Sequence, residues 1–179
     1  MRQIGYRIVN SRLQSMARRI DPPFIYAGWG TAYVFRIGRT TNLLVVSRDG
    51  EWRKGLVAAA TVLRRALAKG FTRAEVDEQL AKLRAGHESS VVGADTPFNS
   101  LLVSDVLYSD DIAPTTPAAA LAWFKAFAPT VTPAKVLAAM KAEAVPLNAP
   151  LIRFQGRRAP QGGSQALRAA WAEGEGAVE

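Results

Sequence analysis

Residues 22–47 read PPFIYAGWGTAYVFRIGRTTNLLVVS, and this stretch decides the fold class. Two runs rich in aromatic and β-branched residues flank Gly38, and such runs are typical of strands. Gly38 predicts a turn between two antiparallel strands, and Gly28 and Gly30 predict a bulge or kink within the first strand. The centre of this sequence is therefore predicted to be a β-hairpin.

Helices are predicted on both sides of the hairpin. Apolar residues recur at helical spacing over residues 4–20, and the following Asp-Pro-Pro ends that helix because proline cannot donate a backbone hydrogen bond. Residues 52–67 carry one apolar stripe opposed by four basic residues, and Gly70 is placed for a left-handed C-terminal cap. Those four opposing residues are Arg53, Lys54, Arg64 and Arg65. Thr72 and Glu75 form a capping box that predicts a further helix.

The second half of the chain continues this alternation. We expect a helix over residues 101–108, and helices opened by Thr116-Pro117 and by Thr132-Pro133, where a capping residue precedes proline. Residues 151–154 predict a last short strand. Together these elements predict an α+β domain over residues 1–156, with an antiparallel sheet packed against several helices. Residues 157–179 are predicted to form a linker and a weak terminal helix.

Composition excludes several kinds of chemistry. The 179 residues include no Cys and one His, so disulfides, thiol nucleophiles and multi-histidine metal sites cannot form within the chain. Charge is uneven, since residues 1–73 hold 14 Lys/Arg and 3 Asp/Glu while residues 74–179 hold 9 and 12. Such a basic part can dock an anionic partner. Because its arginines are dispersed rather than clustered, a face that pairs with an acidic neighbouring domain or is simply solvated is favoured. We therefore predict no catalytic residue, metal ligand or cofactor in this chain.

His87 is the single candidate for a general base near neutral pH. It lies on a predicted apolar helical stripe, and the chain has no Gly-x-Ser-x-Gly sequence to present a nucleophile, which favours a packed histidine. A metal-free enzyme that uses His87 stays an alternative. Asp105, Asp110 and Asp111 form an acidic cluster without the ligand spacing of a calcium loop, which favours a turn.

Aromatic residues alternate with arginines near the hairpin, an arrangement that can stack nucleic-acid bases on a cationic face. These aromatics are Tyr6, Tyr26, Trp29 and Tyr33. Packing in a core or an interface is the commoner role of strand aromatics. Trp29, Arg36 and Arg39 are accordingly the interface candidates, and a small basic nucleic-acid-binding or protein-interaction module is the alternative function.

No apolar run reaches the ~18–20 residues that span a bilayer. Arginines interrupt residues 1–20, which leaves no hydrophobic core for a signal peptide. We expect a soluble chain without a membrane span, and its compartment is left open.

The order of several segments resembles the zinc peptidases of the pitrilysin/insulinase (M16) family. The similarity extends over about residues 8–170 and is best to the non-catalytic domain that follows the zinc domain in bacterial members. It is carried by residues 10–18 (NSRLQSMAR), 22–28 (PPFIYAG), 49–56 (DGEWRKGL), 64–67 (RRAL), 70–76 (GFTRAEV), 124–129 (FKAFAP) and 150–156 (PLIRFQG).

The resemblance implies a LuxS/MPP-like metallohydrolase fold, here incomplete on the N-terminal side. It implies that homologous domains pair into a chamber that holds a peptide, with zinc on a His-x-x-Glu-His domain. This chain lacks that motif, so it is expected to be no enzyme by itself. Its expected partners are a zinc-bearing M16 domain or subunit, a further copy of itself, and a peptide substrate, with nucleic acid disfavoured. Relatives of this type are often periplasmic.

Overall fold

The computed structural model describes residues 1–34, 37–94, 115–142, 147 and 150–176. These residues form two compact units. The sheet unit comprises Met1–Thr72 and Pro133–Glu179, and the helical unit comprises Arg73–Thr132. Within the described residues a two-stranded antiparallel sheet accompanies six α-helices, so the predicted α+β class is confirmed.

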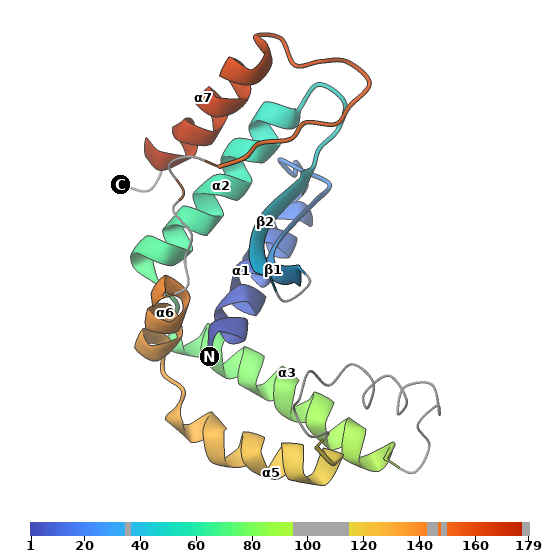
Figure 1. The fold of residues 1–179 in the computed structure, drawn as a ribbon, viewed down its shortest axis with the longest axis vertical. Coiled ribbons are helices and arrows are strands. Elements are labelled where there is room, and N and C mark those ends of the chain that lie inside the picture. Colours follow the sequence, from blue (N-terminus) through green and yellow to red (C-terminus); the bar gives the residue numbers. More distant parts are fainter. Residues whose placement is uncertain (35–36, 95–114, 143–146, 148–149, 177–179) are drawn as a thin grey trace. The chain divides into compact units, whose positions relative to one another are not determined.

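The sheet unit opens with helix α1 (Arg2–Ala17), which lies beside strand β1 (Tyr26–Val34) in Figure 1. The helix ends earlier than the predicted residue 20, ahead of the Asp-Pro-Pro sequence. Its apolar face is buried up to Leu13, and Ile8, Val9 and Leu13 are each at most 1 % exposed. This face therefore anchors the sheet unit.

Strand β1 pairs with β2 (Gly38–Val46) in one unbroken register, from Tyr26 opposite Val46 to Val34 opposite Gly38. The predicted bulge at Gly28 and Gly30 is therefore wrong. A bulge would place two residues opposite one, whereas each glycine here has its own partner.

Helix α2 (Trp52–Lys69) packs against helix α7 (Gly163–Gly176), and the two lie side by side in Figure 1. Arg64 was expected on the solvated face of α2, but it is buried at 8 % exposure. Its Nη1 atom donates a 2.6 Å hydrogen bond to the carbonyl of Trp171, and its guanidinium lies 4.5 Å from the centre of that indole ring. The terminal helix is thus an integral part of the sheet unit.

Helix α6 (Pro133–Ala142) closes the unit against α1. A β-carbon on Gly5 of α1 would collide with Sδ of Met140 on α6, so the two helices approach at a glycine. Gly70 ends α2 with φ +76°, a backbone conformation that favours glycine, and its carbonyl accepts a 3.0 Å hydrogen bond from Arg12. The predicted cap position at Gly70 is confirmed, but its ψ of −146° lies outside the left-handed helical conformation that the prediction assumed.

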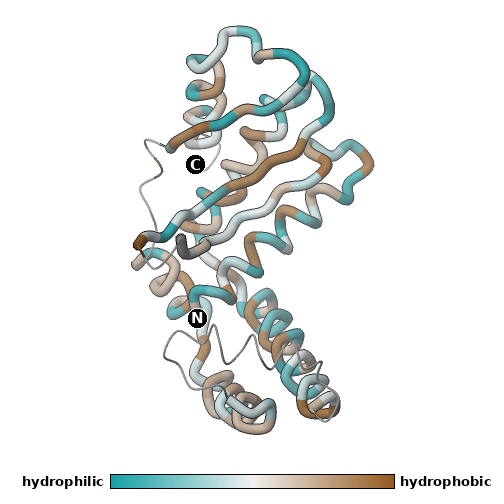
Figure 2. Tube along the Cα trace, turned by 45° about the vertical axis from the view of Figure 1, so that its right-hand side comes forward, coloured by the Kyte–Doolittle hydropathy of each residue, from teal (hydrophilic) through white to brown (hydrophobic). Residues whose placement is uncertain are grey.

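The helical unit contains α3 (Arg73–Val92), α5 (Pro117–Phe127) and the short 3-10 turn η1 (Ala128–Thr130). Helix α3 begins directly after Thr72, as the capping box predicts. Helix α5 begins as predicted too, because the Thr116 hydroxyl accepts a 3.2 Å hydrogen bond from the Ala119 amide. Figure 2 shows hydrophilic and hydrophobic residues interspersed along the helices.

The second half of the chain differs from expectation at the predicted strand. Residues 151–154 form no strand, although exposed and half-buried residues alternate along them and Phe154 contacts Trp52 edge-on with ring centres 6.1 Å apart. The helix expected over residues 101–108 lies outside the described residues. The sequence-based boundary between residues 156 and 157 does not coincide with the division into units, because α7 packs on α2.

Candidate functional site

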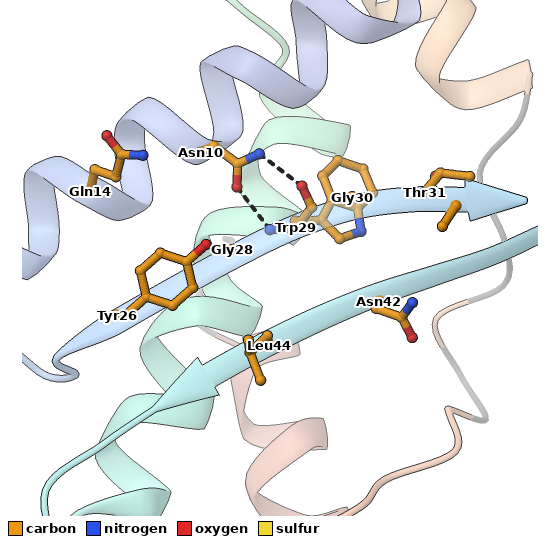
Figure 3. Close-up of a pocket in the computed structure, with 10 residues that line it drawn as sticks. Asn10, Gln14, Tyr26, Gly28, Trp29, Gly30, Thr31, Asn42 and Leu44 are labelled. Atoms are coloured by element: carbon orange, nitrogen blue, oxygen red, sulfur yellow. Dashed lines mark hydrogen bonds between the residues drawn. The ribbon is translucent and has the colours of Figure 1, made fainter. Parts of the chain in front are cut away.

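An open groove of about 450 Å³ runs along β1, where α1, β1 and β2 meet (Figure 3). Its lining combines side-chain amides, one exposed tyrosine and small residues of the strand. The lining residues are Asn10, Gln14, Tyr26, Gly28, Trp29, Gly30, Thr31, Ala32, Asn42 and Leu44. All of them belong to the sheet unit.

Asn10 of α1 holds the outer edge of β1 through two hydrogen bonds. Its Nδ2 atom donates to the Trp29 carbonyl at 2.8 Å, and its Oδ1 atom accepts from the Trp29 amide at 2.8 Å, as drawn in Figure 3. These are the two groups that a neighbouring strand would pair with, so the side-chain amide takes the place of a strand residue. The edge of β1 is therefore closed at Trp29.

The inner face of the sheet is filled by a packed aromatic pair. The rings of Tyr6 and Trp29 meet edge-to-face with centres 4.8 Å apart, and both residues are at most 7 % exposed. The Thr31 hydroxyl donates to the Tyr6 hydroxyl at 2.9 Å and lies 3.2 Å from the Thr41 hydroxyl oxygen. These hydroxyl groups are hydrogen-bonded to one another, as buried polar groups usually are. Together with the buried rings, they make this side of the sheet part of the core.

The outer face of the sheet forms the floor of the groove. The Tyr26 ring lies over Gly28, where a β-carbon would stand 2.6 Å from the tyrosine oxygen. Above Gly30 there is open space, since a β-carbon there would meet nothing within 4 Å. Tyr26 and Leu44 are 49 % and 57 % exposed, so one end of the groove has an apolar wall.

The groove has a cationic setting. Helix α1 and strand β2 contain arginines, whereas α1, β1 and β2 contain no Asp or Glu. The acid that follows α1, Asp21, is held by Lys54 at 2.9 Å. The hydrogen bond from Lys54, together with its positive charge, lowers the pKa of Asp21 from its ordinary value of 3.8. No carboxylate of the three lining elements offsets their positive charge.

The three interface candidates from the sequence are not brought together. Trp29 is buried at 7 % exposure and lines the groove, so its indole belongs to the core and offers no free stacking face. Trp29 pairs with Leu43 of β2, and Arg39 lies four residues before Leu43 on the same strand. Arg39 is therefore roughly 13 Å from the position of Trp29, measured along the strand. Arg36 lies outside the described residues.

The sequence interpretation missed Asn10. Asparagine is a poor helix former, and here it stands beside the buried Val9 and Leu13. A polar residue of this kind next to the apolar face of a helix is the one signal that could have indicated a specific hydrogen-bonding role.

His87 lies in the helical unit, and its ring is 5.1 Å from that of Phe124 at an interplanar angle of 34°. The hydroxyl of Ser90 donates to the Gly86 carbonyl of the same helix at 3.0 Å, so it is engaged with the backbone. The cluster of Asp105, Asp110 and Asp111 lies outside the described residues.

Metal ligands and membrane-spanning helices are absent from the described part of the chain. No group of three or more His, Asp or Glu side chains lies close enough together there to hold a metal ion. Among the helices of the same residues, none combines the length and the apolar character that crossing a bilayer requires.

Comparison of the chain with protein-family models, with curated proteins and with solved structures finds no match.

Proposed function

We propose that this chain is a non-catalytic domain of the M16 type, which packs against a zinc-bearing domain or subunit and forms part of a peptide-holding chamber. The chain itself supplies no zinc ligand and performs no hydrolysis. In this proposal the described sheet is part of a larger LuxS/MPP-like sheet that is completed in the assembly. Support comes from the order of the segments that resemble the family and from the exposed outer face of the sheet.

The exposed face is the observation that carries the proposal. Tyr26, Leu44 and Val46 are 49 %, 57 % and 41 % exposed and lie on one face of the sheet, since Tyr26 pairs with Val46 and Leu44 pairs with Gly28. Clustered apolar residues on a sheet face mark a surface that another protein covers. The helices α1 and α2 occupy the inner face, so a partner would cover the outer one.

Co-expression with a zinc-bearing M16 domain from the same organism tests the proposal. We expect one stable complex in gel filtration, with zinc only on the partner. Leu44→Asp should abolish the complex because it places a charge within the apolar patch. Thr40→Asp is the matched control, since Thr40 is exposed on the same strand face away from the patch.

Either of two results would overturn the proposal. One is stoichiometric zinc together with peptidase activity in this chain alone. The other is a chain that forms no complex with the zinc-bearing domain, or that associates only with a second copy of itself.

A further inference from the structure

The groove and two arginines share one face of α1 and its C-terminal extension. Asn10 and Gln14 line the groove. Arg7 precedes Asn10 by three residues and Arg18 follows Gln14 by four, so all four side chains lie on the same side of the helix. Both arginines are exposed. The lining of the groove is therefore neutral and amide-rich, and the helical spacing places one arginine beyond each of its ends, outside the lining residues.

Its shape fits an extended chain. Arg7 and Arg18 are about 16 Å apart along the helix axis, at 1.5 Å per residue, and roughly five extended residues span that distance. The open space above Gly30 lets a backbone approach the strand closely. An added strand cannot pair with β1 at Trp29, because Asn10 occupies its amide and carbonyl. A bound segment must therefore lie across the outer face.

Charge complementarity selects the occupant. We propose that the groove binds an extended acidic peptide segment, with its carboxylates at Arg7 and Arg18 and its backbone over Gly30. Side-chain amides are suited to the main-chain groups of a peptide. Tyr26 and Leu44 form the end of the groove that the partner domain covers, so the peptide lies over Gly30 between this chain and the partner. This inference rests on the proposed function, because it names the class of peptide that the chamber would hold.

The observations favour a peptide over a single-stranded nucleic acid. Proteins that bind single strands stack successive bases on several aromatic side chains. Here Tyr6 and Trp29 pack against each other in the core, at 6 % and 7 % exposure, so Tyr26 is the single aromatic of the groove lining with an exposed side chain.

Fluorescence anisotropy with the full chain tests the inference directly. The probe is a labelled peptide of alternating Glu and Val, about seven residues long. The controls are the same peptide with Gln in place of Glu, and an oligothymidylate of similar length. We expect the Glu peptide to bind about tenfold more tightly than the Gln peptide at low salt. This preference should fade between about 0.01 M and 0.15 M salt, as the Debye length falls from ~30 to ~8 Å.

Gly30→Val distinguishes a binding role of the groove from a purely structural one. Valine fills the open space over the strand and suits a strand better than glycine, so the fold should be kept while binding falls at least roughly tenfold. Gly38→Val is the matched control, because a β-carbon there also meets nothing within 4 Å and Gly38 is not among the lining residues. Binding by that variant should be unchanged.

Charge reversal supplies an independent test. Arg7→Glu and Arg18→Glu should each weaken binding of the Glu peptide and leave the Gln peptide unaffected. Arg168→Glu on α7 alters the net charge equally at an exposed position outside the groove and should have no effect.

Each remaining outcome decides the question. Equal affinity for the Glu and Gln peptides, no binding at low salt, or unchanged binding by Gly30→Val would refute the inference. Tighter binding of the oligothymidylate, lost in Gly30→Val, would assign the groove to nucleic acid instead. If the peptide binds but no complex with a zinc-bearing domain forms, the groove is correct and the proposed function is wrong. If the complex forms but the peptide does not bind, the proposed function stands and the groove assignment is wrong.

Discussion

Replacing Asn10 by alanine tests how the groove is held together. The substitution removes two hydrogen bonds of 2.8 Å to the amide and carbonyl of Trp29. A net contribution of about 0.5–1.5 kcal/mol for each bond gives a loss of about 1–3 kcal/mol. Because the groove is open, water reaches the freed groups, and we expect the middle of that range, about 2 kcal/mol.

Urea unfolding measured by tryptophan fluorescence gives the free energy, and hydrogen exchange of the Trp29 amide gives a local readout. The amide should lose protection in Asn10→Ala. The matched control is Asn42→Ala, which removes an exposed groove residue whose amide donates only a 3.3 Å bond to Thr40. Surface changes of this kind stay within about 0.5 kcal/mol.

Asn10→Asp separates the two bonds. The introduced carboxylate can accept from the Trp29 amide but repels its carbonyl, so near neutral pH this variant should be at least as unstable as Asn10→Ala. Protonation of the introduced carboxylate supplies a hydrogen-bond donor again. The stability difference between this variant and the unsubstituted chain should therefore become smaller as the pH falls below about 4. Equal stability of Asn10→Ala and Asn42→Ala, with unchanged exchange at Trp29, would show that Asn10 does not hold the strand edge.

Three further predictions concern the scaffold. Gly5→Ala should destabilise the sheet unit by about 1–3 kcal/mol through its collision with α6, whereas Gly86→Ala, with nothing within 4 Å, should stabilise α3 by about 0.5–1 kcal/mol. Differential hydrogen exchange of the two units distinguishes these effects. Arg64→Met should lower the free energy of unfolding in urea by about 2–4 kcal/mol, because a charged hydrogen bond and a cation–π contact are lost. The amides of α7 should then exchange faster with solvent. Carbon-detected NMR should give Asp21 a pKa below its ordinary value of 3.8, and Lys54→Ala should raise that pKa back toward 3.8. Since the folded-state pKa is the lowered one, the stabilising ion pair is present above the unfolded-state pKa and is lost as the pH falls through the folded-state value.

Local chemistry made part of the fold predictable. The start of α5 follows from Thr116 and Pro117 alone, because the capping bond is made within one turn. The end of α2 follows from Gly70, since few other residues accept a positive φ. The hairpin follows from runs of strand-forming residues, although its regular register does not follow from the glycines within it.

Features that depend on distant residues were not predictable in this way. Arg64 lies at a position that looks solvated in helical projection, and only the packing of Trp171, more than a hundred residues later, buries it. Trp29 looks like an interface residue until the Tyr6 ring is found against it. Asn10 gains its role because α1 passes the edge of β1, which its own sequence neighbourhood does not specify.

The most direct test of the central claim is the peptidase rate of a zinc-bearing M16 domain, measured with and without this chain. If the chain completes the chamber without contributing chemistry, its addition should raise the rate, and Leu44→Asp should remove the increase. The chain alone should show no activity and hold no zinc. An unchanged rate on addition, or hydrolysis by the chain alone, would contradict the account.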